Sequence, residues 1–467
     1  MAKKKSNQSK KNLAQKEIKK ATEKAAKKHP VAFIVVSLVV VAAIAVGGYF
    51  AYKNNLFGSS SNSSASSSSS SLNESSSNGN SQRSSSDGST DSISFHFLTL
   101  GNGNSGDSIY IKAGDNDILI DAGSKSGSAT YICNALKEYV TDGKLEYVIT
   151  THAHSDHYTG MFGNKDSSAS NGYTGVLYQY KVGQIIDFAY MAKATTESSG
   201  KTVLVHNDSN LTADKFSSTS EPYKYITARN FAVSQGAKWN PIDTLTKKGS
   251  NYSISLGNNL SMEFLYQGYY DTGNKSTENN NSVVTLFHQG DSEFLFTGDL
   301  EEDGVESLLE NNPSLGHVKL FKAGHHGSIN ANPDSLYQKI TPETVVISAS
   351  CGVSEYTVDG DNVMPYQSTI DIIAKYTTNV FATTYGDFSG TKGKINDYGD
   401  LNGRVNLTYT EDKAYVYNGN NDTILKDSAW FNKTNDIYAS SDSTKPNRTW
   451  PSVTSKYTTP LIYSNPN

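Results

Sequence analysis

In Thr151-His152-Ala153-His154-Ser155-Asp156-His157, three histidines and one carboxylate lie within six residues, although the 467-residue chain has only ten histidines. The stretch directly follows Glu146–Thr150, an apolar run that predicts a buried strand. The four side chains can meet at one point only if the chain turns where that strand ends. Imidazole is a common zinc ligand, and an adjacent carboxylate allows a second cation to lie beside the first. The stretch therefore predicts a metal site at a strand end.

Three other polar segments occupy equivalent positions. Each follows a predicted strand: Asp121-Ala122-Gly123 after Asp117–Ile120, Thr297-Gly298-Asp299 after Glu293–Phe296, and Gly324-His325-His326-Gly327-Ser328 after Val318–Phe321. Taken alone, each is a weak signal, because a Gly-Asp pair ahead of acidic residues also suits the N-cap of a helix. Together with the histidine cluster, the four strand ends predict a binuclear metal site.

The pattern around these segments alternates short apolar strands with amphipathic helices. It predicts an α/β fold in which sheet packs on sheet and helices lie outside. The region from about 190 to 280 is polar and rich in Gly and Asn, and we interpret it as a long insertion or a surround of the active site. Two cysteines are too few for a disulfide scaffold or a cysteine-ligated zinc module.

The N-terminus predicts a membrane anchor. Residues 1–30 carry eleven lysines and two glutamates, and 31–51 form an uncharged apolar run that would span roughly 31 Å as a helix. The positive-inside rule places 1–30 in the cytoplasm as a Lys-rich tail and the rest of the chain outside. A cleaved signal peptide is the alternative, and we favour an uncleaved signal anchor because the apolar run and its charged leader are long.

The remaining segments divide by composition. Residues 52–91 are Ser-rich and predict a disordered linker, 92–417 form the expected folded domain that carries the four polar strand ends, and 418–467 form a C-terminal tail of unknown role. The net charge is −5 for the whole chain in spite of the basic N-terminus. The exported part is therefore acidic, which argues against a basic nucleic-acid clamp.

The order of the four polar strand ends resembles the metallo-β-lactamase superfamily, over roughly Ser92 to Tyr417. The resemblance implies a four-layer αβ/βα sandwich and a metallo-hydrolase with two divalent metal ions, zinc or alternatively manganese. Carried onto this sequence, the implied metal ligands are His152, His154, Asp156, His157, the bridging Asp299 and His325. Asp121 resembles the buried aspartate that supports the ligand loop in this family.

Finer details resemble two exported members of the superfamily. LxxG…GDS at Leu100–Ser108, NNNSVV at Asn279–Val284, FLFTGD at Phe294–Asp299 and HHGS at His325–Ser328 are similar to the extracellular C-terminal domain of the competence protein ComEC and to the pneumococcal phosphorylcholine esterase. The resemblance implies a phosphate-ester substrate: a wall polymer, a small ester or DNA. The acidic balance of the exported part favours a small or terminal phosphodiester.

One expected ligand is missing. The superfamily usually supplies another histidine between the His cluster and the bridging aspartate. His288 is expected at a hairpin turn far from Asp299, His206 is a weaker candidate, and Asn281 or water is the alternative ligand. Asp156 and His326 are the predicted catalytic side chains, with His326 either moving a proton to the leaving group or contacting the phosphate.

These observations lead to one functional prediction and two alternatives. We expect a single-pass protein of the cell membrane whose extracellular domain is a metal-dependent phosphodiesterase that uses a metal-activated water. Within this prediction, a nuclease and an esterase acting on phosphate-bearing wall polymers both stay open, with the cell wall as a further partner. The alternatives are a lactonase or β-lactamase-type hydrolase of carbonyl substrates and a non-catalytic surface binding module.

Overall fold

The computed structural model describes residues 92–196, 202–351, 364–385, 403–410, 413–416, 422–428, 431, 449–458 and 461–463. The chain divides into two units, 1–85 and 86–467. The predicted cytoplasmic tail, membrane anchor and Ser-rich linker, which together span 1–91, lie outside the described residues. None of the helices in the described part is long and apolar enough to cross a membrane.

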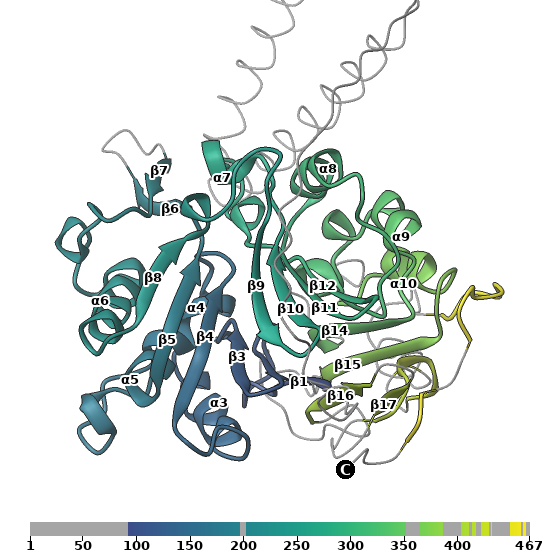
Figure 1. The fold of residues 1–467 in the computed structure, drawn as a ribbon, viewed down its shortest axis with the longest axis horizontal. Helices are drawn as coiled ribbons and strands as arrows, with labels where there is room; N and C mark the ends of the chain where they lie inside the picture. Colours follow the sequence, from purple (N-terminus) through teal and green to yellow (C-terminus); the bar gives the residue numbers. More distant parts are fainter. Residues whose placement is uncertain are drawn as a thin grey trace, which may run out of the picture. The chain divides into compact units, whose positions relative to one another are not determined.

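Two sheets form the centre of the second unit (Figure 1). The first has the order β17 (Ala414–Val416), β16 (Val405–Tyr409), β1 (Ile93–Phe97), β2 (Ile109–Ala113), β3 (Asn116–Ile120), β4 (Lys144–Thr150), β5 (Lys181–Asp187) and β8 (Lys238–Pro241). The second has the order β15 (Asn379–Tyr385), β14 (Thr344–Cys351), β13 (Leu320–Lys322), β12 (Ser292–Phe296), β11 (Thr285–Gln289), β10 (Leu260–Phe264) and β9 (Tyr252–Gly257).

The two sheets face each other across an apolar core. Alternating residues of β1 point into it, and the ring of Phe95 lies 4.9 Å from that of Phe294 and 5.5 Å from that of Phe296, centre to centre. All three side chains are buried. Burial of one phenylalanine contributes about 1.5–3 kcal/mol. The period-two pattern of Ser92–Leu100 therefore determines which face of β1 meets the second sheet.

Helices cover the outer faces of both sheets (Figure 1). The first sheet packs against α3 (Ser128–Leu136), α4 (Ser155–Phe162), α5 (Val176–Gln179) and α6 (Glu221–Ser234), and the second against α8 (Glu302–Asn311), α9 (Asp334–Ile340) and α10 (Gln367–Ile373). A short helix, α7 (Tyr269–Thr272), precedes β11. The predicted α/β sandwich, with sheet on sheet and helices outside, is confirmed.

Of the two interpretations of the region from about 190 to 280, a long insertion is wrong. Its end does border the site, where Glu278 Oε1 accepts the backbone N–H of Ala153 over 3.3 Å. The region supplies β8 to the first sheet and both β9 and β10 to the second. Phe264 and Met262 of β10 are fully buried in the central core. Only the hairpin of β6 (Tyr190–Thr196) and β7 (Thr202–His206) forms a separate two-stranded sheet. The apolar positions of β9 and β10 alternate with polar ones, which is the pattern of a strand, but the polar composition of the whole region obscured it.

Parallel pairing brings the chemically important strand ends together. β3 pairs in parallel with β4, so that Asp121 and Thr151 leave the first sheet at the same edge. β12 pairs in parallel with β13, so that Asp299 and His325 follow neighbouring strands of the second sheet. The carboxyl ends of parallel strands lie on one side of a sheet. The topology thus creates a single site from four distant parts of the chain.

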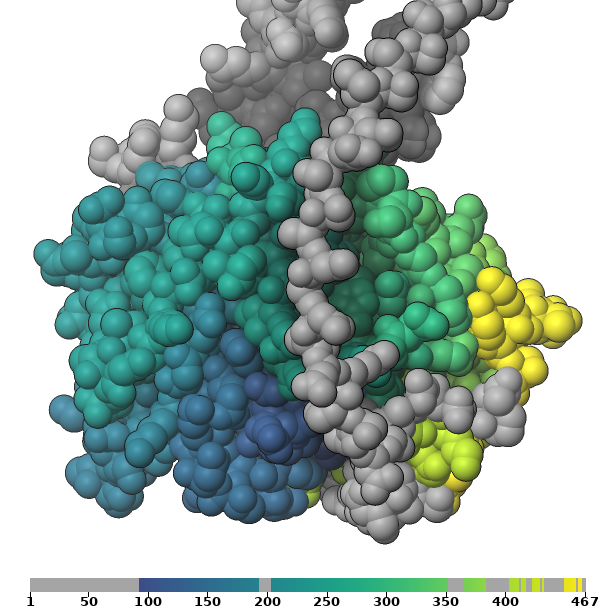
Figure 2. All heavy atoms as spheres, in the orientation of Figure 1, coloured from purple at the N-terminus to yellow at the C-terminus, as the bar shows by residue number. Residues whose placement is uncertain are grey.

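Parts of the C-terminal tail pack on the same unit. The backbone N–H of Tyr457 donates to the carbonyl of Tyr376 over 2.7 Å, and Leu425 and Leu461 are buried. Figure 2 shows the segment 449–458, in yellow, beside the green half of the surface that the second sheet and its helices form. The described part of the tail thus contributes to packing.

His96, on the outer face of β1, makes stability depend on pH. Burial lowers the pKa of His96 to about 4, while Nδ1–H donates to Asn406 Oδ1 over 3.0 Å. The unfolded chain binds a proton near pH 6.5 and the folded chain does not, so the stability present above pH 6.5 is lost as the pH falls toward 4. We expect His96 to account for about 2 kcal/mol of the loss between pH 7 and pH 5.

Urea unfolding of wild type and His96→Phe at pH 7 and pH 5 measures this contribution. The variant keeps an aromatic ring against Tyr139 and removes the titrating group. Its loss of stability between the two pH values should be smaller than that of wild type by the same amount. An equal loss in both proteins would contradict the assignment.

Candidate metal centre

Asp121 organises the loop that carries the histidine cluster. It follows β3 with a left-handed backbone, φ 58°, and is fully buried. Its Oδ1 accepts the backbone N–H of Thr151 over 2.8 Å, and its Oδ2 accepts the hydroxyl of Thr151 over 2.7 Å. The loop that begins at the end of β4 is therefore attached to the neighbouring strand end before its first histidine.

Gly123 lets the loop of Asp156 approach the end of β3. A Cβ added at Gly123 would lie 1.5 Å from the carbonyl oxygen of Asp156, a distance that no side chain can occupy. The backbone N–H of Ala122 also donates to the carbonyl of His157 over 2.7 Å. Any residue other than glycine at position 123 would push the metal-site loop outward.

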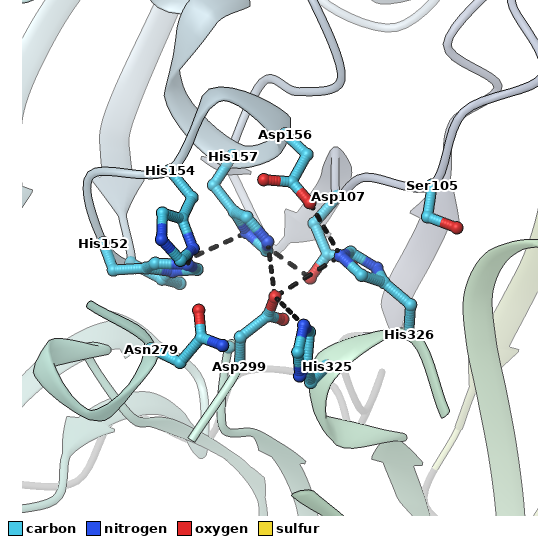
Figure 3. Close-up of polar contacts among 12 residues, drawn as sticks. Ser105, Asp107, His152, His154, Asp156, His157, Asn279, Asp299, His325 and His326 are labelled. Atoms are coloured by element: carbon cyan, nitrogen blue, oxygen red, sulfur yellow. Dashed lines mark hydrogen bonds and ion pairs between the residues drawn. The ribbon is translucent and has the colours of Figure 1, made fainter. Parts of the chain in front are cut away.

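Four potential ligands converge at the centre of the site: Asp156, His157, Asp299 and His326. One donor atom from each lies within 4.8 Å of the others. Asp299 Oδ2 lies 2.9 Å from His157 Nε2 and 3.3 Å from His326 Nε2, and Asp156 Oδ2 lies 3.2 Å from His326 Nε2 (Figure 3). The group combines two residues of α4, at the edge of the first sheet, with one residue after β12 and one after β13 of the second sheet.

Hydrogen bonds at Nδ1 aim both imidazoles of this group. His157 Nδ1–H donates to Asp121 Oδ2 over 2.8 Å, and His326 Nδ1–H donates to the carbonyl of Ser348 over 2.8 Å. Both residues are completely buried. With Nδ1 occupied in this way, each ring directs Nε2 toward Asp299, the orientation in which histidine ligates a metal.

A second pair of donors lies beside this group. His152 Nε2 and His154 Nδ1 are 3.1 Å apart. The Nδ1 of His152 lies 3.1 Å from the hydroxyl of Thr151 and 3.3 Å from that of Ser282. Burial, together with the neighbouring His157 and His154, lowers the pKa of His152 well below its usual value. His152 is therefore neutral, the form that binds a cation.

Opposite charges are concentrated among the buried side chains of the centre. Burial alone would raise the pKa of Asp299, but His157, His326 and Lys322 outweigh it and hold the pKa well below its usual value. Burial alone would likewise lower the pKa of His157 and of His326, but Asp299 and the other carboxylates outweigh it and raise both. A carboxylate that stays ionised when buried is suited to a cation.

His325 and His326 occupy different positions although they are adjacent. Both have left-handed backbones, φ 43° and 54°. His326 belongs to the central group, whereas His325 Nε2 lies 4.0 Å from Asp299 Oδ2 and its Nδ1 lies 3.1 Å from Ser328 Oγ. Two successive non-glycine residues in this conformation store strain of about 1–3 kcal/mol each, as is common at functional sites.

The other sequence-predicted candidates are distributed as follows. Asn281 lies near the site, but its side chain forms hydrogen bonds with the backbone of Asn274. Asp299 is not the N-cap residue of α8, because Glu301 occupies that position. His288 pairs with Glu263 at the hairpin end and His206 pairs with Asp243, so neither reaches the centre. Asp299 lies beside Ser282, at the opposite end of the hairpin from His288: Ser282 Oγ accepts the backbone N–H of Asp299 over 3.1 Å.

Two charged residues of the site were not predicted from sequence. Lys322, the last residue of β13, and Asp107, in the loop before β2, form an ion pair, and each is 1% exposed. Lys322 Nζ also lies 3.4 Å from Asp299 Oδ1. Burial alone would lower the pKa of Lys322, but the negative charges of Asp107 and Asp299 outweigh the effect of burial and raise this pKa. Lys322 is therefore a cation beneath the ligands.

These residues fit divalent cations. Carboxylate and imidazole donors are a common set for zinc and manganese. Asp299 belongs to the group of four, and it also lies beside His152 and His154 (Figure 3). The side chain of Asp156 is 24% exposed and His154 is half-buried, whereas the other ligands are buried. A substrate would therefore approach from the side of Asp156 and His154.

Comparison with known proteins agrees with this geometry. Residues 101–166 match the sequence profile of the Metallo-beta-lactamase superfamily. ComE operon protein 3 of Bacillus subtilis is 27% identical over 116 residues, which cover 25% of this chain and 14% of that protein. The chain thus matches only a small part of the length of this relative.

Solved structures with a similar fold include three of different description. The metallo-β-lactamase fold protein YhfI of Bacillus subtilis has a TM-score of 0.34 at 12% identity, covering 62% of this chain and 96% of its own. A diphosphatase of the PhnP family has 0.31 at 10%, covering 68% and 98%. The short form of human tRNase Z has 0.29 at 10%, covering 62% and 91%. Residues 101–166, which include the histidine cluster, thus match the Metallo-beta-lactamase superfamily, and the grouped Asp and His donors agree with that match.

Proposed function

We propose that this chain is a membrane-anchored, extracellular phosphodiesterase that depends on two divalent cations. The observation that carries the proposal is the position of Asp299. It faces His157 and His326 on one side and the His152–His154 pair on the other (Figure 3). A carboxylate between two sets of donors can be shared by two cations.

Two cations held there would supply Lewis acidity and the activation of water at neutral pH. The chain's own part is to fix the donors and to exclude bulk water. Asp121 and the carbonyl of Ser348 orient His157 and His326 through Nδ1, which limits the movement of both rings. Asp156, being partly exposed, lies where a substrate would enter.

We further propose that the two histidines of the HHGS segment exchange their expected roles. His326 has its Nδ1–H committed to Ser348 and its Nε2 facing two carboxylates, which suits a metal ligand. His325 lies beside Asp299 and within reach of Ser328 Oγ and Glu301, 3.1 Å and 3.8 Å from its Nδ1. That position suits proton transfer to a leaving group.

A phosphodiester is favoured over a carbonyl substrate for two reasons. The HHGS and NNNS segments resemble those of exported phosphate-ester hydrolases, and part of the chain is similar to ComE operon protein 3. The nearest lysine, Lys322, is 1% exposed and cannot reach a substrate. The cations would thus provide most of the attraction for phosphate, which suits a small or terminal diester better than a long polyanion.

Hydrolysis of bis(p-nitrophenyl) phosphate by the full chain tests the proposal. The assay includes zinc, manganese or EDTA, with a chromogenic β-lactam and a lactone as parallel substrates. We expect turnover of the diester that EDTA abolishes. Turnover of the lactone or β-lactam alone would favour the carbonyl hydrolase, and no turnover with two metals bound would reject catalysis on either class.

The proposed topology has a separate test. Protease added to intact cells should degrade the part from 92 onward and leave the Lys-rich tail, 1–30, protected. Degradation of neither part would reject the extracellular location.

A further inference from the structure

Besides the shared Asp299 of the proposed function, the described part of the chain brings no further His, Cys, Asp or Glu donor into a compact group with His152 and His154. The two ring nitrogens lie 3.1 Å apart, as a shared cation requires. Yet the clusters of three or more His, Cys, Asp or Glu donors among the described residues do not include this pair. An additional donor at this site must therefore be of another chemical type.

Asn279 has an unused buried oxygen at this place. The residue is 3% exposed, and its Oδ1 is buried with no hydrogen-bond partner. Figure 3 shows its side chain between Asp299 and the two histidines, with the amide oxygen directed toward the histidines. A buried carbonyl left without a partner costs about 1–3 kcal/mol, so the arrangement calls for a ligand.

Glu301 fixes the orientation of the Asn279 amide. Asn279 Nδ2 donates to Glu301 Oε1 over 2.7 Å. A carboxylate accepts only from the NH₂ end of an amide, so the oxygen must face the opposite way. The direction of Oδ1 into the site therefore follows from the chemistry of its partner.

The two neighbouring asparagines do not offer such an oxygen. Asn281 Oδ1 accepts the backbone N–H of Asn274 over 2.7 Å, and Asn280 Oδ1 accepts that of Glu301 over 2.8 Å. Both carbonyls therefore serve the loop and the start of α8. Of the three residues in the turn Asn279–Asn281, Asn279 alone directs an unpartnered oxygen toward the histidine pair.

We propose that Asn279 Oδ1 is the additional protein ligand of the cation bound by His152 and His154, in place of the histidine that the superfamily usually supplies. The inference rests on the two-cation site of the proposed function. An uncharged oxygen in place of an imidazole makes this cation the more weakly held of the two. An oxygen ligand also reduces the preference of this site for zinc over manganese, because manganese binds oxygen ligands more readily than it binds imidazole.

Metal titration of the full chain tests the assignment without reference to activity. Metal-free protein is titrated calorimetrically with Zn²⁺ and with Mn²⁺, and the number of sites and their affinities are compared for wild type, Asn279→Ala, Asn279→Asp and Asn279→His. Asn134→Ala, on the exposed side of α3, is the matched control.

We expect two sites in wild type and a weaker site that loses at least about 10-fold in affinity in Asn279→Ala, with the tighter site unchanged. Asn279→Asp should keep or strengthen the weaker site, and Asn279→His should increase its preference for zinc over manganese. If Asn279 had only a structural role, Asn279→Asp should weaken the weaker site, since a second carboxylate against Glu301 would disrupt the turn.

The outcomes separate the inference from the proposed function. Two sites in wild type with the same affinities in Asn279→Ala would overturn the role of Asn279 and leave the phosphodiesterase proposal standing. Fewer than two sites in wild type would overturn both. If Asn279→Ala does not fold, a loss of the weaker site in Asn279→Asp decides against the inference.

Discussion

Asn in place of Asp299 should abolish phosphodiester hydrolysis and deplete the site of metal. Asn is nearly isosteric, and the contact of the backbone N–H with Ser282 Oγ is retained. The change removes the carboxylate that lies 2.9 Å from His157 Nε2 and 3.3 Å from His326 Nε2, while Lys322 stays beneath it. We expect at least about 10³-fold lower kcat, more than the loss of a single transition-state donor usually causes.

The measurement pairs turnover of bis(p-nitrophenyl) phosphate with metal content per chain. His326→Ala should resemble Asp299→Asn in both, because His326 belongs to the central group. His325→Ala should keep both metals and lose turnover only. An Asp299→Asn protein with two metals and normal turnover would show that the centre is not the reaction site. Loss of metal in His325→Ala but not in His326→Ala would favour His325 as the ligand and His326 as the catalytic side chain.

The sequence located this centre but not its inner arrangement. The four strand ends were predictable because parallel strands deliver their carboxyl ends to one edge, and the histidine cluster marks that edge. Which of His325 and His326 lies in the central group of four was not predictable, because that depends on two successive left-handed residues. For the same reason Asn279 could not be separated from Asn281: the segment forms a tight turn instead of a strand start, and neighbouring side chains diverge.

The buried ion pair of Lys322 and some strands of the two sheets were not predicted from the sequence. Lys322 looks like an ordinary polar position of a short strand, and only its pairing with Asp107, more than two hundred residues earlier, explains why it is 1% exposed. The strands β9 and β10 were obscured by the polar composition around them, although they place Leu256, Leu260, Met262 and Phe264 in the central core. The pairing of Lys322 with Asp107 leaves no local signal in a single sequence.

Replacement of Lys322 by Met should lower the free energy of unfolding more than the other substitutions considered for stability, His96→Phe and Lys319→Met. Asp107 would then be a buried carboxylate without its cationic partner, and Asp299 Oδ1 would lose the cation 3.4 Å away. Removal of one member of a buried ion pair typically costs about 3–5 kcal/mol. We expect a decrease of that size in the free energy of unfolding, measured by urea titration of the metal-free protein.

The comparison that gives this prediction its meaning is with Lys319→Met. Lys319 pairs with Glu343 over 2.7 Å, but both side chains are about one-third exposed, and such pairs contribute about 0–1 kcal/mol. The double variant Lys322→Met/Asp107→Asn removes both charges and should recover more than half of the loss, because an uncharged amide is far cheaper to bury than a carboxylate. If Lys322→Met costs no more than Lys319→Met, the buried pair does not stabilise the fold, and the lysine beneath Asp299 must be explained by the charge it gives the metal centre alone.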